Sequence, residues 1–146
     1  HQRYPKALEI VHQYWRQLPE KKKYNHILRR TEDLYENWDC SNEGFEGIRA
    51  QDILPLLESM FSCQTFIGFA NVVDIFIDRS FGHNFNPADS KDKSFIDSLH
   101  AEDELGLKEG YLTPTKMLAV YTKQNHNKQY FSRGVSPSRI LNTLKM

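Results

Sequence analysis

The apolar stretch CQTFIGFA, residues Cys63–Ala70, decides the fold of this chain. It is apolar almost throughout, and Gly68 lies inside it. A short continuous apolar run is typical of a strand buried on both faces, as in sheets that lie between two layers of helices. A glycine within such a strand lets another part of the backbone approach closely. We therefore predict a strand over residues 63–70 and an α/β fold.

The residues after this strand predict two helices and a second strand. Apolar residues within 72–77 have helical spacing, and a strand that continued through them would be about three times the usual length. We therefore predict that a helix follows, with Asn71 as its N-cap. A longer helix is expected from residues 89–90 to about Gly106. The segment Lys116–Thr122 is apolar in its middle and is predicted to be the second strand.

Three further helices are predicted before residue 63. Pro5–Leu18 is amphipathic, with apolar residues spaced for one buried face. Glu20–Asn37 is charged but carries apolar residues at helical spacing, which predicts a second, more exposed helix. Ile53–Phe61 predicts a third. Asp52 is expected to be its N-cap, because a proline such as Pro55 is tolerated only near the start of a helix.

The last part of the chain, residues 123–146, is a polar tail with five basic and no acidic residues. Ser136-Pro137 is a typical helix start, so we predict a short helix at 137–145. Residues 1–122 then form one partial α/β domain with about two strands and four to five helices in the chain. Two strands do not make a stable sheet alone. We expect that a partner chain, or a larger protein of which this is a part, completes the sheet.

The composition excludes several classes of function. Nineteen basic and nineteen acidic residues cancel, so no overall field favours nucleic acid. No apolar run reaches the about 18 residues of a membrane-spanning helix, and no signal peptide is visible. Cys40 and Cys63 make neither a disulfide framework nor a zinc motif, which indicates a reducing, cytoplasmic setting. The chain does not begin with methionine, so we expect a processed chain or a piece of a longer one.

A polar loop before the third helix concentrates charge. Residues 38–52 contain two glycines, two aromatic and five charged side chains. The loop leads to a helix N-terminus, where unpaired backbone N–H groups favour anions. Arg49 is a candidate anion binder, because its guanidinium suits carboxylate or phosphate. The structural alternative is that Arg49 pairs with Glu46 or Asp52 and that the loop only starts the helix.

The loop that follows residue 80 holds a second group of candidates. His83 lies between Gly82 and Asn84 and has the chemistry of a general base near neutral pH. Arg79 is a second candidate anion binder. The alternatives are a histidine that only stabilises the loop, and a structural ion pair of Arg79 with Asp78. No P-loop, nucleophile elbow or dinucleotide motif occurs, and no histidines have metal-ligand spacing, so no metal is expected.

Five segments are distinctive in their order and spacing: HQRYPKAL (1–8), GFEGIRAQDIL (44–54), FIGF (66–69), DRSFGHNF (78–85) and TPTKM (113–117). Together they resemble the C-terminal half of a group of bacterial class I S-adenosylmethionine-dependent methyltransferases, over about residues 1–122. The resemblance implies a Rossmann-like, doubly wound sheet of seven strands. Residues 63–70 would be the sixth strand, and residues 116–122 the antiparallel seventh.

The cofactor-binding elements of that family have no counterpart in this chain. Its glycine-rich turn after the first strand, and its acidic residue at the end of the second, both lie upstream of the matched part. The resemblance therefore implies that a full-length parent binds S-adenosylmethionine. It implies that this chain alone binds no cofactor and is inactive, and that it contributes part of the sheet and the acceptor side of the pocket.

Methyl transfer requires a positioned acceptor and, for oxygen or nitrogen acceptors, a group that removes a proton. By their position in the resemblance, the candidate bases are Asp39, Glu46 and His83. The acceptor would be a small molecule or a saccharide-type compound. The candidate residues for binding it are Trp38, Glu43, Phe45, Arg49, Arg79 and Asn84.

A function of another class is a non-catalytic interaction module. An exposed sheet edge and apolar faces would then drive homodimerisation, or strand exchange with a partner chain. Nucleic-acid binding through Lys21–Lys23 and the basic tail is a third idea, and it is not favoured, because runs of like charge are usually solvated faces.

Overall fold

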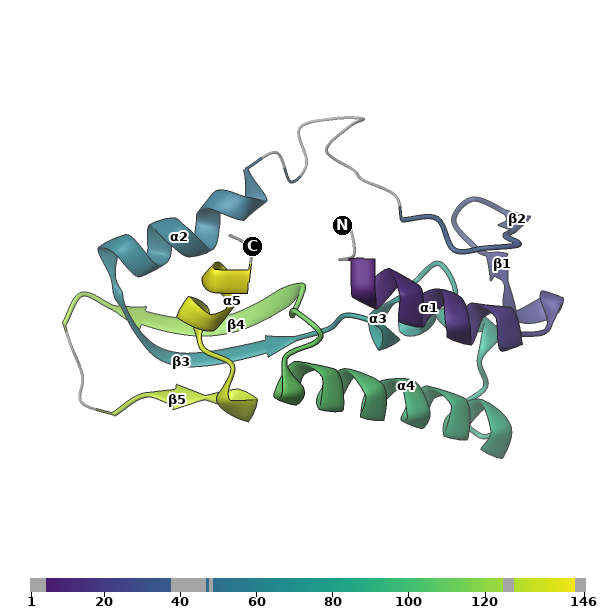
Figure 1. Cartoon of the computed structure of the whole chain (residues 1–146). Helices are drawn as coiled ribbons and strands as arrows, with labels where there is room; N and C mark the ends of the chain where they lie inside the picture. The colour runs from purple at the N-terminus through teal and green to yellow at the C-terminus, as the bar shows by residue number, and fades with distance from the viewer. Residues whose placement is uncertain (1–4, 38–46, 48, 125–127, 144–146) are drawn as a thin grey trace.

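A computed structural model, which describes residues 5–37, 47, 49–124 and 128–143, shows a mixed α/β protein (Figure 1). Within these residues five α-helices accompany two small sheets. The elements in chain order are α1 (Pro5–Gln17), η1 (Glu20–Lys22), β1 (Tyr24–Asn25), β2 (Arg30–Thr31), α2 (Ala50–Met60), β3 (Ser62–Phe69), α3 (Val73–Ile77), η3 (Gly82–Asn84), α4 (Ser90–Glu109), β4 (Lys116–Thr122), β5 (Tyr130–Phe131), η4 (Ser132–Gly134) and α5 (Pro137–Thr143).

The larger sheet has the strand order β4-β3-β5. β3 and β4 pair antiparallel, with Phe66 opposite Ala119 and Gly68 opposite Met117. The strands predicted at 63–70 and 116–122 are therefore confirmed. β5 adds a short parallel neighbour on the other side of β3. Its two residues are too few to produce a recognisable pattern in the sequence.

Among the described residues, helices cover this sheet on one face only. Leu54 of α2 and Ile140 of α5 pack with Phe66 of β3 in one hydrophobic cluster. On β4, Leu118 and Val120 are 56% and 45% exposed. The expectation that the strand at 63–70 is buried on both faces is therefore wrong for the described residues. The physical reason is visible in Figure 1: α1, α3 and α4 pack beyond the end of the sheet rather than across its second face.

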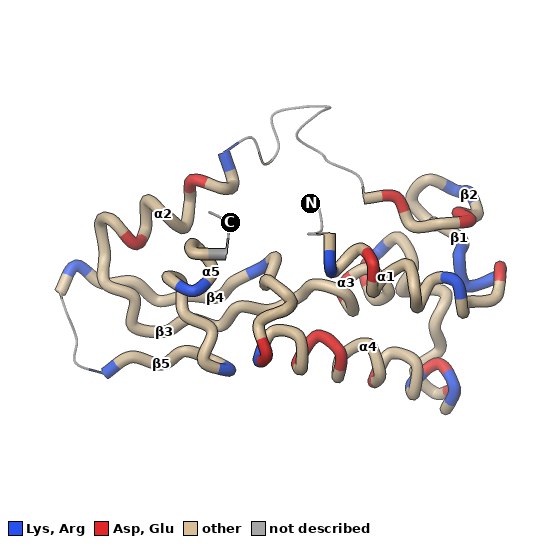
Figure 2. The backbone as a smooth tube through the Cα atoms, in the orientation of Figure 1, with Lys and Arg blue, Asp and Glu red and all other residues tan. Residues whose placement is uncertain are grey.

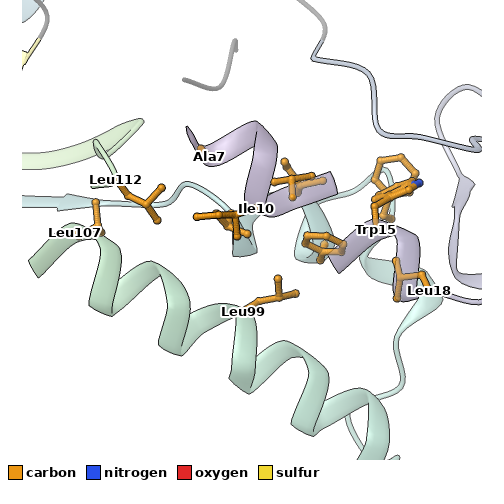
Figure 3. Packing of buried hydrophobic residues seen from close by; sticks show 12 residues of the cluster. Ala7, Ile10, Trp15, Leu18, Leu99, Leu107 and Leu112 are labelled. Atoms are coloured by element: carbon orange, nitrogen blue, oxygen red, sulfur yellow. The ribbon is translucent and has the colours of Figure 1, made fainter. Parts of the chain in front are cut away.

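Those three helices enclose the larger hydrophobic core (Figure 3). Trp15 of α1 is fully buried, and its ring meets Phe81 edge-on at a centroid distance of 4.9 Å. Leu99 of α4 is equally buried. The helix predicted over Pro5–Leu18 is confirmed as α1, and its apolar stripe faces this core as the periodicity indicates.

The second predicted helix, Glu20–Asn37, is wrong. The segment forms η1 and a two-stranded hairpin, in which Tyr24 pairs with Thr31. Asn25 accounts for the difference, because its Oδ1 accepts hydrogen bonds from the backbone N–H groups of Ile27 and Leu28, both at 3.0 Å. Such local bonds compete with helix formation.

The start of α2 also differs from the expectation. The helix begins at Ala50, with Arg49 in the N-cap position, so Asp52 is not the cap. The backbone N–H of Ala50 donates to the carbonyl of Gly47 at 3.1 Å, and this turn starts the helix earlier than expected. Pro55 consequently lies within the helix rather than in its first turn.

α3 is confirmed as a helix, but its cap is not Asn71. Asp103, on α4, accepts from the backbone N–H groups of Val72 and Val73, while Asn71 donates to the carbonyl of Thr113. α4 starts where the sequence predicts, at residues 89–90, and of these two residues Asp89 is the N-cap: its side chain accepts from the backbone N–H groups of the first turn. The last segment, residues 128–143, packs on the sheet, and α5 lies where the sequence predicts a short helix.

Charged residues of both signs are interspersed along the described elements (Figure 2). Among the residues that the structure describes, none of the helices has the length and apolar character needed to cross a membrane. The same residues contain no group of three or more His, Cys, Asp or Glu side chains placed to hold a metal ion.

Candidate functional site

A pocket of about 330 Å³ lies where α3, η3 and the first turns of α4 meet. This volume is at the lower end of the range of about 300–1,000 Å³ for small-molecule sites. The lining residues are Phe76, Ile77, Asp78, Arg79, Gly82, His83, Phe85, Asn86, Pro87, Asp92, Lys93, Ile96 and Asp97. Two residues singled out in the sequence, Arg79 and His83, are therefore brought to one cavity.

Part of the pocket wall is apolar and rigidly packed. Phe85 stacks on Phe95 of α4 at a centroid distance of 5.5 Å and an interplanar angle of 4°. Phe76 meets Phe95 edge-on at 5.6 Å. Ile77 ends α3 and is 55% exposed, so it presents apolar surface to the opening. The wall offers a ligand a preformed apolar surface.

Gly82 holds η3 tightly against the end of α3. A Cβ atom at this position would lie 2.7 Å from the carbonyl oxygen of Ile77. The backbone N–H of Gly82 also donates to the carbonyl of Asp78 at 2.7 Å. Only glycine fits so close an approach without a shift of the backbone.

Two of the three carboxylates that line the pocket have structural partners in the backbone. Oδ1 of Asp78 accepts from the N–H groups of Ser80 and Phe81, at 2.7 and 3.3 Å. Oδ2 of Asp92 accepts from the N–H of Asn86 at 2.8 Å and from Lys22 of η1. Both hydrogen bonds lower the pKa of Asp92 below its usual value. The bond from Asn86 has the larger effect, and the bond from Lys22 the next largest.

The cations that line the pocket also differ in whether a neighbouring side chain pairs with them. Lys93 pairs with the third carboxylate, Asp97, at 2.5 Å. Arg79 has no hydrogen bond or ion pair with any residue that the structure describes. The Asp78–Arg79 ion pair left open by the sequence is not formed, because Asp78 turns to the backbone. Arg79 is thus the lining cation whose charge is not balanced by a direct partner in the described chain.

His83 lies on the rim, edge-to-face with His26 of the hairpin at a centroid distance of 5.3 Å. It makes no hydrogen bond with the described residues. An imidazole at this place is available to accept a proton from a bound molecule. The arrangement can therefore combine charge pairing through Arg79 with proton transfer through His83.

Asn84 has a structural role behind the pocket. Its Nδ2 donates to the carbonyls of Lys22 and Tyr24 at 3.1 and 2.8 Å. Its Oδ1 lies 2.8 Å from Nε2 of His26, which must carry the proton of this bond because an amide oxygen only accepts. The carboxamide ties the hairpin segment to η3, and Asn84 is not among the lining residues.

Arg49 is not among the residues that line this pocket. Arg49 pairs with Asp52 at 2.6 Å on the exposed start of α2, which is the structural alternative for this residue. Trp38, Asp39, Glu43, Phe45 and Glu46 lie outside the described residues.

Sequence reasoning did not single out the apolar wall or the α4 residues of the pocket. Phe76, Phe85 and Ile96 have the ordinary pattern of core residues, and α4 begins only after the loop. The alternation of aromatic and polar residues in the loop after residue 80 was the only available signal.

A second group of titratable side chains lies under α2. Cys63 of β3 is 5% exposed, and burial is the main reason that the pKa of its thiol is raised. Tyr121, opposite Cys63 in the sheet, also has a raised pKa, first through burial and then through Glu58. A raised pKa disfavours the thiolate, so Cys63 does not fit the role of a nucleophile.

The turn after β3 lacks the features of the glycine-rich cofactor turn that the sequence resemblance implies after the first strand of the family's sheet. The turn has no glycine between Ala70 and Val73. The backbone N–H groups of Val72 and Val73 are already occupied by Asp103. The described residues therefore do not fit the cofactor at this turn.

Comparisons with known proteins identify no relative. No model of a known protein family matches the chain, and no curated protein or solved structure matches it.

Proposed function

We propose that this chain is the C-terminal portion of an S-adenosylmethionine-dependent methyltransferase. It contributes the end of a Rossmann-like sheet and the acceptor side of the pocket. The observation that carries the proposal is the pairing of β4, which runs antiparallel to β3 at the edge of the sheet. The sequence resemblance implies an antiparallel last strand next to the strand at residues 63–70, so the pairing supports it.

The uncovered side of the sheet gives further support. β4 is an edge strand among the described residues, so one row of its backbone N–H and C=O groups has no strand partner there. Leu118 and Val120 add exposed apolar side chains on the same strand. Proteins rarely leave a long apolar edge open, and doubly wound sheets are covered on both faces. Further strands and helices of a longer protein would satisfy both requirements.

The pocket is the proposed acceptor side. Arg79 and His83 line it, and both belong to the segment DRSFGHNF that takes part in the resemblance. Arg79 would orient the acceptor, and His83 would take its proton if the acceptor atom is oxygen or nitrogen. S-adenosylmethionine would be the methyl donor, bound by an upstream portion of the parent.

The experiment compares S-adenosylmethionine binding by isothermal titration calorimetry to this chain and to the longer parent. Binding by the parent alone is the expected result. If neither protein binds the cofactor at millimolar concentration, the proposal is wrong. If the 146-residue chain binds by itself, the assignment of cofactor binding to an upstream portion is wrong.

The same exposed edge favours a second candidate, a non-catalytic module that dimerises through β4. Two copies would pair their edge strands and bury Leu118 and Val120. Sedimentation velocity distinguishes the candidates: a dimer that Leu118→Lys and Val120→Lys convert to monomer supports the module. A monomer at about 100 μM, which corresponds to an interaction weaker than about −5 kcal/mol, contradicts it.

A further inference from the structure

We propose that the pocket between α3, η3 and α4 binds a small molecule that joins one carboxylate to a flat apolar body, such as a substituted aromatic ring. Binding itself follows from the pocket alone. Only the role of that ligand as a methyl acceptor rests on the proposed function.

The hydrogen bonds and ion pairs around the pocket leave one lining cation, Arg79, without a direct partner among the described residues. Asp97 is neutralised by Lys93, and Asp92 by Lys22. The carboxylate of Asp78 is taken by backbone N–H groups. Arg79 therefore remains as a guanidinium without a direct partner in the described chain. A guanidinium binds a carboxylate through two parallel hydrogen bonds, which orient the ligand as well as hold it.

The same set of charges favours a monoanion. Three carboxylates, those of Asp78, Asp92 and Asp97, line the pocket. They would repel a doubly charged phosphate more strongly than a singly charged carboxylate, and among the described residues the pocket offers one guanidinium without a direct partner to offset the repulsion. A carboxylate is thus the anion that matches the site.

The apolar wall determines the rest of the ligand. Ile77 is exposed at the opening, and Phe85 and Ile96 continue the surface inward. Burying this surface against a ligand is favourable. The ring of Phe85 is held in place by stacking on Phe95 and by Lys22, whose Nζ lies 5.0 Å from the ring centroid, so this part of the wall is formed before a ligand binds. A volume of about 330 Å³ accommodates one substituted ring rather than a large ligand.

The test is an NMR titration of the ¹⁵N,¹³C-labelled 146-residue chain with sodium benzoate, benzyl alcohol and phenyl phosphate. Benzoate is expected to shift the signals of His83, Phe85 and Ile96 with a Kd of about 1 mM, typical of a small fragment. Benzyl alcohol lacks the charge, and phenyl phosphate carries a second one. Each is expected to bind at least about fivefold more weakly.

Three variants separate the contributions. Arg79→Gln keeps the length of the side chain but loses its charge, and should weaken benzoate binding by about tenfold. Lys91→Gln is the matched control, because Lys91 is exposed on α4 and does not line the pocket, and should change Kd by less than about twofold. Ile77→Gln should weaken benzoate and benzyl alcohol alike. These three side chains are exposed, so the fold is expected to persist, and circular dichroism verifies it.

The proposal is overturned if benzoate leaves the pocket signals unchanged, or if Arg79→Gln binds benzoate as well as the parent sequence does. Benzoate binding combined with no cofactor binding by any longer form would leave the pocket assignment intact and contradict the methyltransferase. Cofactor binding by a longer form, without benzoate binding, would support the methyltransferase and contradict the pocket assignment.

Discussion

Asp103 of α4 caps α3 from a distance of 31 residues, with its Oδ1 accepting a hydrogen bond from the backbone N–H of Val72 at 2.8 Å. Its Oδ2 accepts from the N–H of Val73 at 2.9 Å. The carboxylate is almost fully buried, at 3% exposed. α3 leads directly to Ile77 and Arg79 of the pocket, so this one side chain positions the start of the candidate site.

Asp103→Ala should destabilise the protein by about 2–4 kcal/mol, because it leaves one buried and one partly buried backbone N–H group without an acceptor. Urea denaturation followed by circular dichroism measures the change. Asp97→Ala is the control on the same helix: its carboxylate is exposed and paired only with Lys93, so the loss should stay below about 1 kcal/mol. Equal losses for the two variants would contradict the capping role.

The stability contribution of Asp103 should depend on pH in the sense opposite to that of most carboxylates. Burial, the largest influence, raises its pKa above the ordinary value of 3.8. The folded protein therefore holds the proton more tightly than the unfolded chain. The associated stability is fully present below pH 3.8 and is lost as pH rises through the folded pKa. Urea denaturation measures the free energy of unfolding of the wild type relative to that of Asp103→Asn. This difference should fall as pH rises from 3.8 through the folded pKa, and an increase would contradict the predicted pH dependence.

Arg133 and Glu104 join the C-terminal segment to α4 and should show the usual pH dependence. Arg133 Nε and Nη2 each donate to Glu104 at 2.6 Å, and this pairing is the main reason that the pKa of Glu104 lies below 4.5. Arg133→Gln should cost about 1 kcal/mol at pH 7, since the pair is partly exposed. The cost should shrink as pH falls below 4.5 through the lowered folded pKa, because Glu104 is then protonated.

Lys91→Gln is the matched control for that substitution, since Lys91 is exposed at the start of α4 and forms no ion pair with the described residues. Its effect should be below about 0.5 kcal/mol at both pH values. Thermal unfolding at pH 7 and pH 3 compares the two variants, and a pH-independent cost of Arg133→Gln would exclude the ion pair as its cause.

Trp15 should be the most costly single truncation in the core. It is fully buried, and its Nε1 donates to the carbonyl of Glu32 at 3.2 Å, which attaches the hairpin segment to α1. Trp15→Ala should cost about 3–5 kcal/mol. Trp15→Phe keeps most of the packing but loses the hydrogen bond. It should therefore increase amide hydrogen exchange in the hairpin more than in α4, and a uniform increase would argue against this attachment.

Cys63 should be chemically inert in the folded protein. Its thiol is buried and has a raised pKa, and the thiolate is the reactive form. In a Cys40→Ser variant, which removes the other cysteine, 5,5′-dithiobis(2-nitrobenzoate) should react at least about 100-fold more slowly than in 6 M guanidinium chloride. Similar rates in the two conditions would show that the thiol is accessible.

Local patterns accounted for much of the fold. The apolar periodicity of α1, the apolar runs of β3 and β4, and the start of α4 at residues 89–90 are all short-range features, and they are found where the sequence predicts them. The hairpin at 24–31 was missed because a single residue, Asn25, satisfies nearby backbone groups and overrides a helical spacing.

The candidate site likewise has features that follow from the sequence and features that follow only from the tertiary structure. The sequence by itself determined which residues have the chemistry for binding and proton transfer, Arg79 and His83, and placed them in one loop segment after a helix. Only the tertiary structure decided which charges remain available. Lys22 approaches Asp92 across 70 residues, and Asp103 replaces Asn71 as the cap of α3. The physical reason is that hydrogen bonds and ion pairs act over a few ångströms in space, whatever the separation along the chain.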